Sequence, residues 1–105
     1  MFNCVELENL KNILDDKKIE WFDMSDYNSI DDVDLSIERI HIYQKNIHFS
    51  IVNGFGTYGG YRLYDNKNLG LLELFGTGIG DPIGFLTAEE AFEEMIKKGL
   101  KRGEK

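Results

Sequence analysis

The strongest constraint on the fold is the segment IERIHIYQKNIHFSIV, residues 37–52, in which two β-rich runs flank the polar pair Lys45 and Asn46. This pattern predicts a β-hairpin with a two-residue turn. Such a turn fixes the register, so we expect Tyr43 to face His48 and Ile42 to face Phe49. One side of the hairpin then collects apolar residues: Ile40, Ile42, Ile47, Phe49 and Ile51. The other collects Arg39, His41, Tyr43, His48 and Ser50, as expected of an antiparallel sheet with one face against a core.

Further strands are predicted on both sides of this hairpin. Residues 61–64 and 69–75 are strand candidates joined by the turn-forming sequence DNKN, so a second hairpin should extend the same sheet. In the later strand, Leu72 and Leu74 would point one way, and Leu71, Glu73 and Phe75 the other. Residues 19–24 allow a short strand or an irregular crossover, and IGFL, residues 83–86, is a short apolar run before a helix.

Two amphipathic helices are predicted near the ends of the chain. The first begins with Asn3 as N-cap, Glu6 completing a capping box, and it buries Leu7, Leu10, Ile13 and Leu14. The second begins with Thr87 as N-cap and Glu90 in its capping box. Its apolar stripe consists of Ala91, Phe92, Met95, Ile96 and Leu100.

These elements predict one α+β domain over residues 1–105. We expect an antiparallel sheet of about 4–5 strands, with the N-terminal and the C-terminal helix packed on one face. The opposite face would stay partly open and show His41, Tyr43, His48, Leu71, Phe75 and the aromatics of the glycine-rich loop. A composition of this kind is closer to a binding surface than to an inert one.

Charge and cysteine content exclude several classes of protein. Residues 1–34 carry ten acidic and three basic groups, a balance of −7 that equals the net charge of the whole chain. Five of these carboxylates form the predicted docking surface: Asp23, Asp26, Asp31, Asp32 and Asp34. Such a surface repels nucleic acid and anionic lipid, and it favours a basic protein partner or serves solubility. The single cysteine, Cys4, the lack of a long apolar run and an N-terminus unlike a secretory signal favour a cytoplasmic protein.

The glycine-rich stretch NGFGTYGGY, residues 53–61, contains the spacing Gly54-x-Gly56-x-x-Gly59 that cradles phosphates in other proteins. A dinucleotide site needs a helix after this loop, but the next residues predict a strand. The loop is therefore interpreted as a connection between strands that presents Phe55, Tyr58 and Tyr61. The alternative is a ligand-binding nest formed by residues 54–60, assisted by Arg62, His41 and His48.

The two histidines are predicted to be diagonal neighbours on the open face. A metal ion would need a third ligand, for which Glu73 is the only candidate in reach, so structural histidines are favoured and no cofactor or metal is expected. A small enzyme built around His41, His48 and Glu73 is a third possibility, and it would require a concave site on this face.

The segments SIVNGFGTYGG, GLLEL and IGFLTAEEAFEEMIKK resemble small proteins carried by phages and mobile elements of AT-rich Gram-positive bacteria. The resemblance covers residues 47–98. It implies an α+β fold and a mobile-element origin, and no functional residue is carried over from it. Small acidic proteins of that origin include inhibitors of host defence, such as anti-CRISPR proteins, which occupy basic nucleic-acid-binding surfaces or allosteric sites.

Together these features predict a non-enzymatic protein-interaction module that acts through its acidic first third and its aromatic glycine-rich loop. An anti-defence inhibitor is the specific form suggested by the resemblance, with a basic nucleic-acid-binding host protein as partner. The open sheet face also predicts a homodimer. The alternative function is a protein that sequesters a small ligand or nucleotide at residues 54–60.

Overall fold

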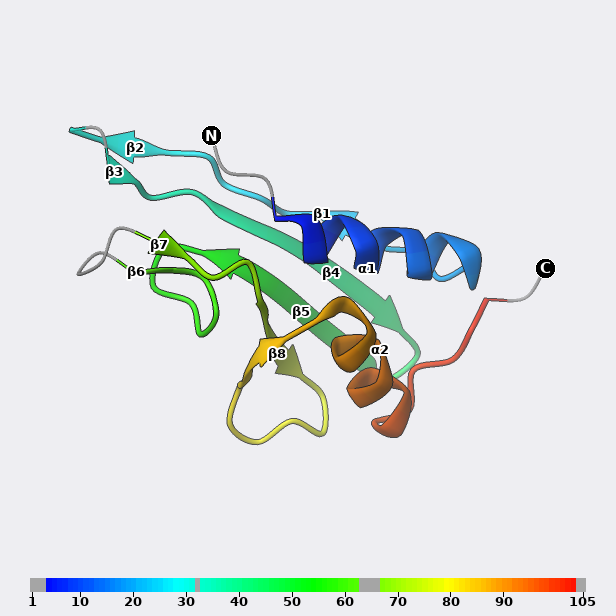
Figure 1. Cartoon of the computed structure of the whole chain (residues 1–105). Coiled ribbons are helices and arrows are strands. Elements are labelled where there is room, and N and C mark those ends of the chain that lie inside the picture. Colours follow the sequence, from blue (N-terminus) through cyan, green and yellow to red (C-terminus); the bar gives the residue numbers. More distant parts are fainter. Residues whose placement is uncertain (1–3, 32, 63–66, 104–105) are drawn as a thin grey trace.

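A five-stranded antiparallel sheet forms the centre of this computed structural model, with strand order β1-β4-β5-β8-β9. The structure describes residues 4–31, 33–62 and 67–103. The strands of the sheet are β1 (Phe22–Asp23), β4 (Ile37–Gln44), β5 (Ile47–Gly54), β8 (Leu72–Gly76) and β9 (Ile83–Leu86). Helices α1 (Val5–Asp16) and α2 (Ala88–Lys97) lie on the same side of it (Figure 1). We call the helix-covered side the inner face and the opposite side the outer face.

The β4–β5 hairpin confirms the predicted register. Tyr43 pairs with His48, Ile42 with Phe49 and Ile40 with Ile51, and the ladder continues to the pair Ile37 and Gly54. Asn46, in the predicted turn, has φ +62°, a conformation that asparagine tolerates better than most residues.

The core lies between the inner face and the two helices. In the core, the predicted apolar side of the hairpin packs against both helices, beside Leu72 and Leu74 of β8. The following core residues from the hairpin and the helices are fully buried: Ile40, Ile42, Phe49, Ile51, Leu7, Leu10, Leu14, Ala91 and Met95. Burial also raises the pKa of the Cys4 thiol. The α+β class and the placement of both helices on one face are therefore confirmed.

The predicted second hairpin is wrong in its pairing. β8 pairs with β5, whereas β6 (Tyr61–Arg62) pairs with β7 (Lys67–Asn68) in a small separate sheet. The reason is the buried Asn53, whose amide donates to the Leu71 carbonyl at 2.8 Å and to Asn68 Oδ1 at 3.1 Å. These bonds, with φ +75° at Gly70, end β7 before β8 begins. Residues 65–66 of the predicted turn at residues 65–68 lie outside the described residues, and residues 67–68 are strand.

Two more short elements were not predicted. The run IGFL forms the edge strand β9, paired with β8 through a β-bulge. β2 (Ser29–Ile30) and β3 (Val33–Asp34) pair as a small hairpin, which extends beyond the main sheet (Figure 1). The short strand predicted within residues 19–24 is confirmed as β1.

The helix caps give one confirmation and one correction. Thr87 and Glu90 form the predicted capping box at the start of α2. The cap of α1 is Cys4, without a side-chain hydrogen bond, and the predicted cap Asn3 lies outside the described residues. Glu6 contributes to the start of the other helix, where its Oε1 accepts a hydrogen bond from the Ala88 amide of α2 at 2.8 Å. A carboxylate there satisfies an otherwise free amide at a helix N-terminus.

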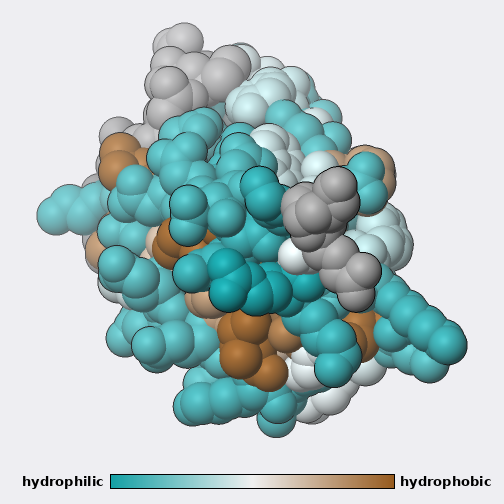
Figure 2. All heavy atoms as spheres, turned by 90° about the vertical axis from the view of Figure 1, so that its right-hand side faces the viewer, coloured by the Kyte–Doolittle hydropathy of each residue, from teal (hydrophilic) through white to brown (hydrophobic). Residues whose placement is uncertain are grey.

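In the described ranges, neither helix has the length and apolar character needed to cross a membrane. The end of the molecule that carries the β4–β5 turn and the C-terminal residues is mostly hydrophilic, with small separate hydrophobic groups (Figure 2).

Candidate functional site

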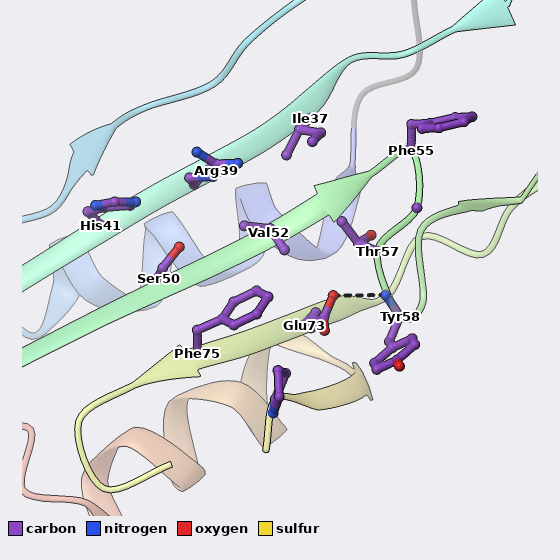
Figure 3. Close-up of a pocket in the computed structure, with 12 residues that line it drawn as sticks. Ile37, Arg39, His41, Ser50, Val52, Phe55, Thr57, Tyr58, Glu73 and Phe75 are labelled. Carbon is purple, nitrogen blue, oxygen red and sulfur yellow. Dashed lines mark hydrogen bonds between the residues drawn. The ribbon is translucent and has the colours of Figure 1, made fainter. Parts of the chain in front are cut away.

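The outer face carries an ordered array of polar and aromatic side chains. Cross-strand pairing places Phe22, His41, Ser50 and Phe75 in one row, and Arg39, Val52 and Glu73 in the next. Residues paired in this way have side chains on the same side of a sheet. Figure 3 shows the members of these rows that lie on β4, β5 and β8, next to the loop that carries Phe55, Thr57 and Tyr58.

This array forms the floor of a hollow of about 660 Å³. The floor contains Arg39, His41, Ser50 and Val52, and the walls come from the glycine-rich loop and from β8 (Figure 3). The remaining lining residues are Ile37, Phe55, Gly56, Thr57, Tyr58, Glu73, Phe75 and Pro82. We call this site the outer-face hollow; its volume falls in the range of about 300–1,000 Å³ that is common for ligand sites.

Glu73 holds the glycine-rich loop against the sheet. Its side chain is 5% exposed, and its Oε1 accepts a hydrogen bond from the Tyr58 amide at 2.9 Å (Figure 3). On the far side of the loop, the Phe85 amide donates to the Tyr58 carbonyl at 3.3 Å, and the rings of Tyr58 and Phe85 stack. These contacts fix the position of the loop, so that it forms an ordered wall of the hollow.

The backbone amides of the loop are mostly used inside the protein. The amide of Gly54 donates to Thr57 Oγ1, that of Phe55 to the Ser36 carbonyl, and that of Gly56 to the Tyr61 carbonyl. The amides of Thr57, Tyr58 and Gly60 also have internal acceptors. A phosphate nest needs convergent free amides, and the Glu73 carboxylate beside them would repel a phosphate. This geometry argues against the phosphate-cradle interpretation of residues 54–60, which stays a prediction.

The three loop aromatics line two different hollows, although the ring centroids of Phe55 and Tyr61 lie 6.0 Å apart. Tyr58 is 58% exposed at the rim of the outer-face hollow, and Phe55 also lines it. Tyr61 instead lines a second, smaller hollow with Asp34, Glu38 and Asn53. Gly54 lines that second hollow and Gly56 the first, whereas Gly59 packs against Leu71. The side chain of Arg62 lies outside what the structure describes.

The predicted histidine pair is present beside the hollow. His48 Nε2 lies 3.2 Å from His41 Nδ1, and the same Nδ1 lies 3.0 Å from Tyr43 Oη. The rings of Tyr43 and His48 stack at 4.5 Å, and Phe22 meets Tyr43 edge-on at 5.8 Å. Burial lowers the pKa of His41 below its ordinary value, and the charges of His48 and Arg39 add to this effect.

The predicted enzyme trio is not brought together. Glu73 lies on β8, with β5 between it and His41, and it binds the loop amide. Among the residues that the structure describes, no group of three histidine, cysteine, aspartate or glutamate side chains could hold a metal ion. The hollow does supply the concave surface that an enzyme would need, but its described residues contain no nucleophile paired with a base.

The four acidic docking residues that the structure describes are spread along residues 23–34 and do not form one cluster. Asp23 pairs with Ile40, whereas Asp26 pairs with Ile37 at the outer-face hollow. Asp31 lies in the turn between β2 and β3, and Asp34 lines the second hollow. Asp32 lies outside the described residues. The carboxylates are therefore distributed along residues 23–34, which we call the acidic arm, and they do not make a single acidic face.

Several residues of the site were not identified from the sequence. Phe22 and Phe85 are 42% and 55% exposed, and they join the outer face only because β1 and β9 pair at the two edges of the sheet. Phe85 has φ +60°, which is strained for a bulky side chain. Neither the edge pairing nor this backbone conformation leaves a local pattern in the sequence.

Comparisons with protein-family models, with curated proteins and with solved structures found no match to this chain.

Proposed function

We propose that this chain is a non-enzymatic protein-interaction module that docks its partner on the outer face. The observation that carries the proposal is the set of large aromatic side chains left exposed on one side of the sheet. They range from 37% to 58% exposed: Phe22, Tyr43, Tyr58, Phe75 and Phe85. A small protein rarely leaves so many rings on one face without a partner, and aromatic residues dominate the energetics of protein interfaces.

The composition of the outer face supports a protein rather than a nucleic acid as partner. The floor of the hollow has one arginine, and residues 23–34 add carboxylates at its margin, so phosphates would meet few positive charges. A basic protein partner suits both surfaces, because the acidic arm attracts its positive charges and the exposed aromatic side chains make apolar contacts with it.

The resemblance to mobile-element proteins suggests which basic partner to test first. A nucleic-acid-binding protein of a host defence system, met in the host cytoplasm, would present a basic surface that an acidic inhibitor can occupy. The proposal therefore takes an anti-defence inhibitor as its specific form.

The test is capture of the partner from a host lysate, its identification, and measurement of its affinity for matched variants. Tyr58→Ala and Phe75→Ala should each weaken binding by about tenfold or more, as expected of central aromatic contacts. Ile96→Ala is the control, because Ile96 is 43% exposed on the helix side of the molecule. Equal affinity of all three variants and the native protein would remove the outer face as the docking surface.

A second candidate function is binding of a small ligand in the outer-face hollow. Arg39 and Ser50 supply polar groups on its floor, and Phe55 and Phe75 supply ring surfaces on its walls. This arrangement suits a flat ligand with one anionic group. A panel of nucleotides and aromatic carboxylates should then raise the unfolding temperature through a tightly bound member. Absence of a shift across the panel would exclude this candidate for those ligands.

A further inference from the structure

Glu73 is a buried carboxylate that the fold satisfies only in part. It is 5% exposed, and its Oε1 accepts a hydrogen bond from the Tyr58 amide at 2.9 Å. In the part of the chain that the structure describes, this is the one hydrogen bond of the carboxylate, and no basic side chain forms an ion pair with it. A buried carboxylate ordinarily has several donors or a cation beside it, because its desolvation is costly. Glu73 therefore offers a second acceptor oxygen, Oε2, at the outer-face hollow that it lines.

The side of the hollow around Glu73 consists of apolar and aromatic groups. Val52 is its cross-strand neighbour, and Phe75 lies two residues further along β8 on the same face. Phe55 and Tyr58 lie on the loop wall (Figure 3). Aromatic faces attract cations, and the methylene groups of an arginine pack on apolar surface while its guanidinium reaches a carboxylate. This side of the hollow therefore has the chemistry that suits an arginine side chain.

Arg39, the arginine on the floor of the hollow, does not pair with Glu73. It lies on β4, and β5 separates it from β8, so the two backbones are about 10 Å apart at a strand spacing of about 4.8 Å. Its repulsion of an incoming cation at Glu73 is weakened by salt, since the Debye length is about 8 Å at physiological ionic strength. The chain as a whole, with a net charge of −7, attracts cations.

We propose that the outer-face hollow receives an arginine side chain of the basic partner, with Glu73 as the anion that binds it. The guanidinium donates to Oε2 of Glu73 and stacks on the ring of Phe75, a combination that arginine makes better than lysine. This inference rests on the proposed function, because it names the contact by which the outer face holds its partner. A buried arginine contact of this kind is typical of the residues that dominate an interface.

The first experiment changes the ligand and leaves the protein native. The probes are a capped glycine–arginine–glycine tripeptide and the same peptide with citrulline, which keeps the shape of arginine and lacks its charge. In amide NMR titrations of the full chain, the arginine peptide should shift the signals of Tyr58 and Phe75. The citrulline peptide should bind about tenfold more weakly, because it loses a charge-assisted hydrogen bond. Equal binding of the two peptides, or no shift at these residues, would overturn the proposal.

The second experiment changes the two charges of the hollow. Glu73→Gln keeps an acceptor oxygen for the Tyr58 amide, and it should lower the affinity for the arginine peptide about tenfold. Arg39→Gln should not weaken binding, whereas an anionic ligand would require Arg39. Glu89→Gln is the matched control, because it makes the same change at an exposed glutamate of α2. Circular dichroism verifies the fold of each variant. Native affinity in a folded Glu73→Gln, or loss of affinity in a folded Arg39→Gln, would contradict the proposal, and the peptide pair decides it where a variant does not fold.

The captured partner separates this inference from the proposed function. We expect Glu73→Gln to lower the affinity of the partner about tenfold, as Tyr58→Ala does. If Tyr58→Ala weakens the complex and Glu73→Gln does not, the outer face is the docking surface and the arginine contact is wrong. If neither variant changes the affinity, docking on the outer face is wrong and the arginine contact falls with it.

Discussion

Glu38 is a buried carboxyl group on the inner face, at the second hollow that Asp34 and Asn53 also line. Its side chain is 9% exposed, and its Oε1 accepts a hydrogen bond from the Cys4 amide at 3.2 Å. Burial raises the pKa of this carboxyl above its ordinary value of 4.5, and the bond from Cys4 opposes the shift only in part. The folded protein thus holds the proton more tightly than the unfolded chain does. The stability that this gives is complete below pH 4.5 and is lost as pH rises through the folded-state pKa.

Glu38→Gln tests this relation, because glutamine keeps the acceptor oxygen and cannot ionise. Relative to the native protein, the free energy of unfolding of the variant should increase as pH rises from below 4.5 to neutral. Urea unfolding over that pH series measures the difference. Glu20→Gln is the control at an exposed glutamate. A constant difference between Glu38→Gln and the native protein would contradict the prediction.

Position 60 requires glycine because the fold leaves no space there for a side chain, and not because of its backbone conformation. A Cβ atom at this position would lie 2.1 Å from Thr57 Oγ1 and 2.2 Å from the Gly54 carbonyl oxygen. The wall of the outer-face hollow would have to move. Gly60→Ala should lower the free energy of unfolding by about 1–3 kcal/mol, as overpacked sites do. Gly80→Ala is the matched control, because a Cβ atom there meets nothing within 4 Å. Similar stability of the two variants in chemical denaturation would show that the loop can yield.

Glu6 of α1 links the two helices, because its side chain accepts a hydrogen bond from the amide of Ala88 in α2, 82 residues later in the chain. Its carboxylate caps α2 together with Thr87, so removal should expose the Ala88 amide and loosen the helix pair. Glu6→Ala should cost about 1 kcal/mol or more of the free energy of unfolding. Glu8→Ala is the control, since Glu8 is exposed and its ion pair with Lys11, at 3.7 Å, lies on the surface. Thermal unfolding that ranks Glu8→Ala as the more harmful change would contradict this role of Glu6.

The elements that could be predicted are those whose pattern is local. The β4–β5 register follows from alternation and a two-residue turn, and the α2 cap follows from the spacing of Thr87 and Glu90. The partner of β8 could not be predicted, because it depends on the hydrogen bonds of the buried Asn53 with Leu71 and Asn68. A single sequence gives no sign that this amide is buried.

The candidate site was predicted in part for the same reason. The neighbouring histidines follow from the hairpin register alone. The hollow itself depends on long-range contacts, above all on the bond from the Tyr58 amide to Glu73, which folds the loop over the sheet. Sequence patterns show which residues share a strand face, and they do not show which loop returns to cover it.

At the scale of the whole molecule, the body is elongated, with extents of 45 × 26 × 20 Å, and charged groups lie toward both of its ends. The acidic arm, residues 23–34, reaches toward the end that carries the β2–β3 hairpin (Figure 1). The β4–β5 turn lies at the opposite end, and Lys45, Lys101 and Arg102 gather there around Gln44. Gln44 joins the two segments through two hydrogen bonds with the backbone of Lys101. Charged groups in such positions can steer a charged partner before contact.

The acidic arm should therefore act on the rate of association with a basic partner rather than on the lifetime of the complex. Asp26→Asn and Asp31→Asn together should slow association at low salt, and the difference from the native protein should vanish at high salt. Dissociation should change little, because the aromatic outer face makes the lasting contacts. Lys45→Gln with Arg102→Gln is the opposite-charge control, and it should not slow association. Surface-plasmon resonance over a salt series measures the association and dissociation rates separately. If the arm variant mainly speeds dissociation, the prediction is wrong and the arm itself lies in the interface, because the dissociation rate is controlled by groups inside the interface.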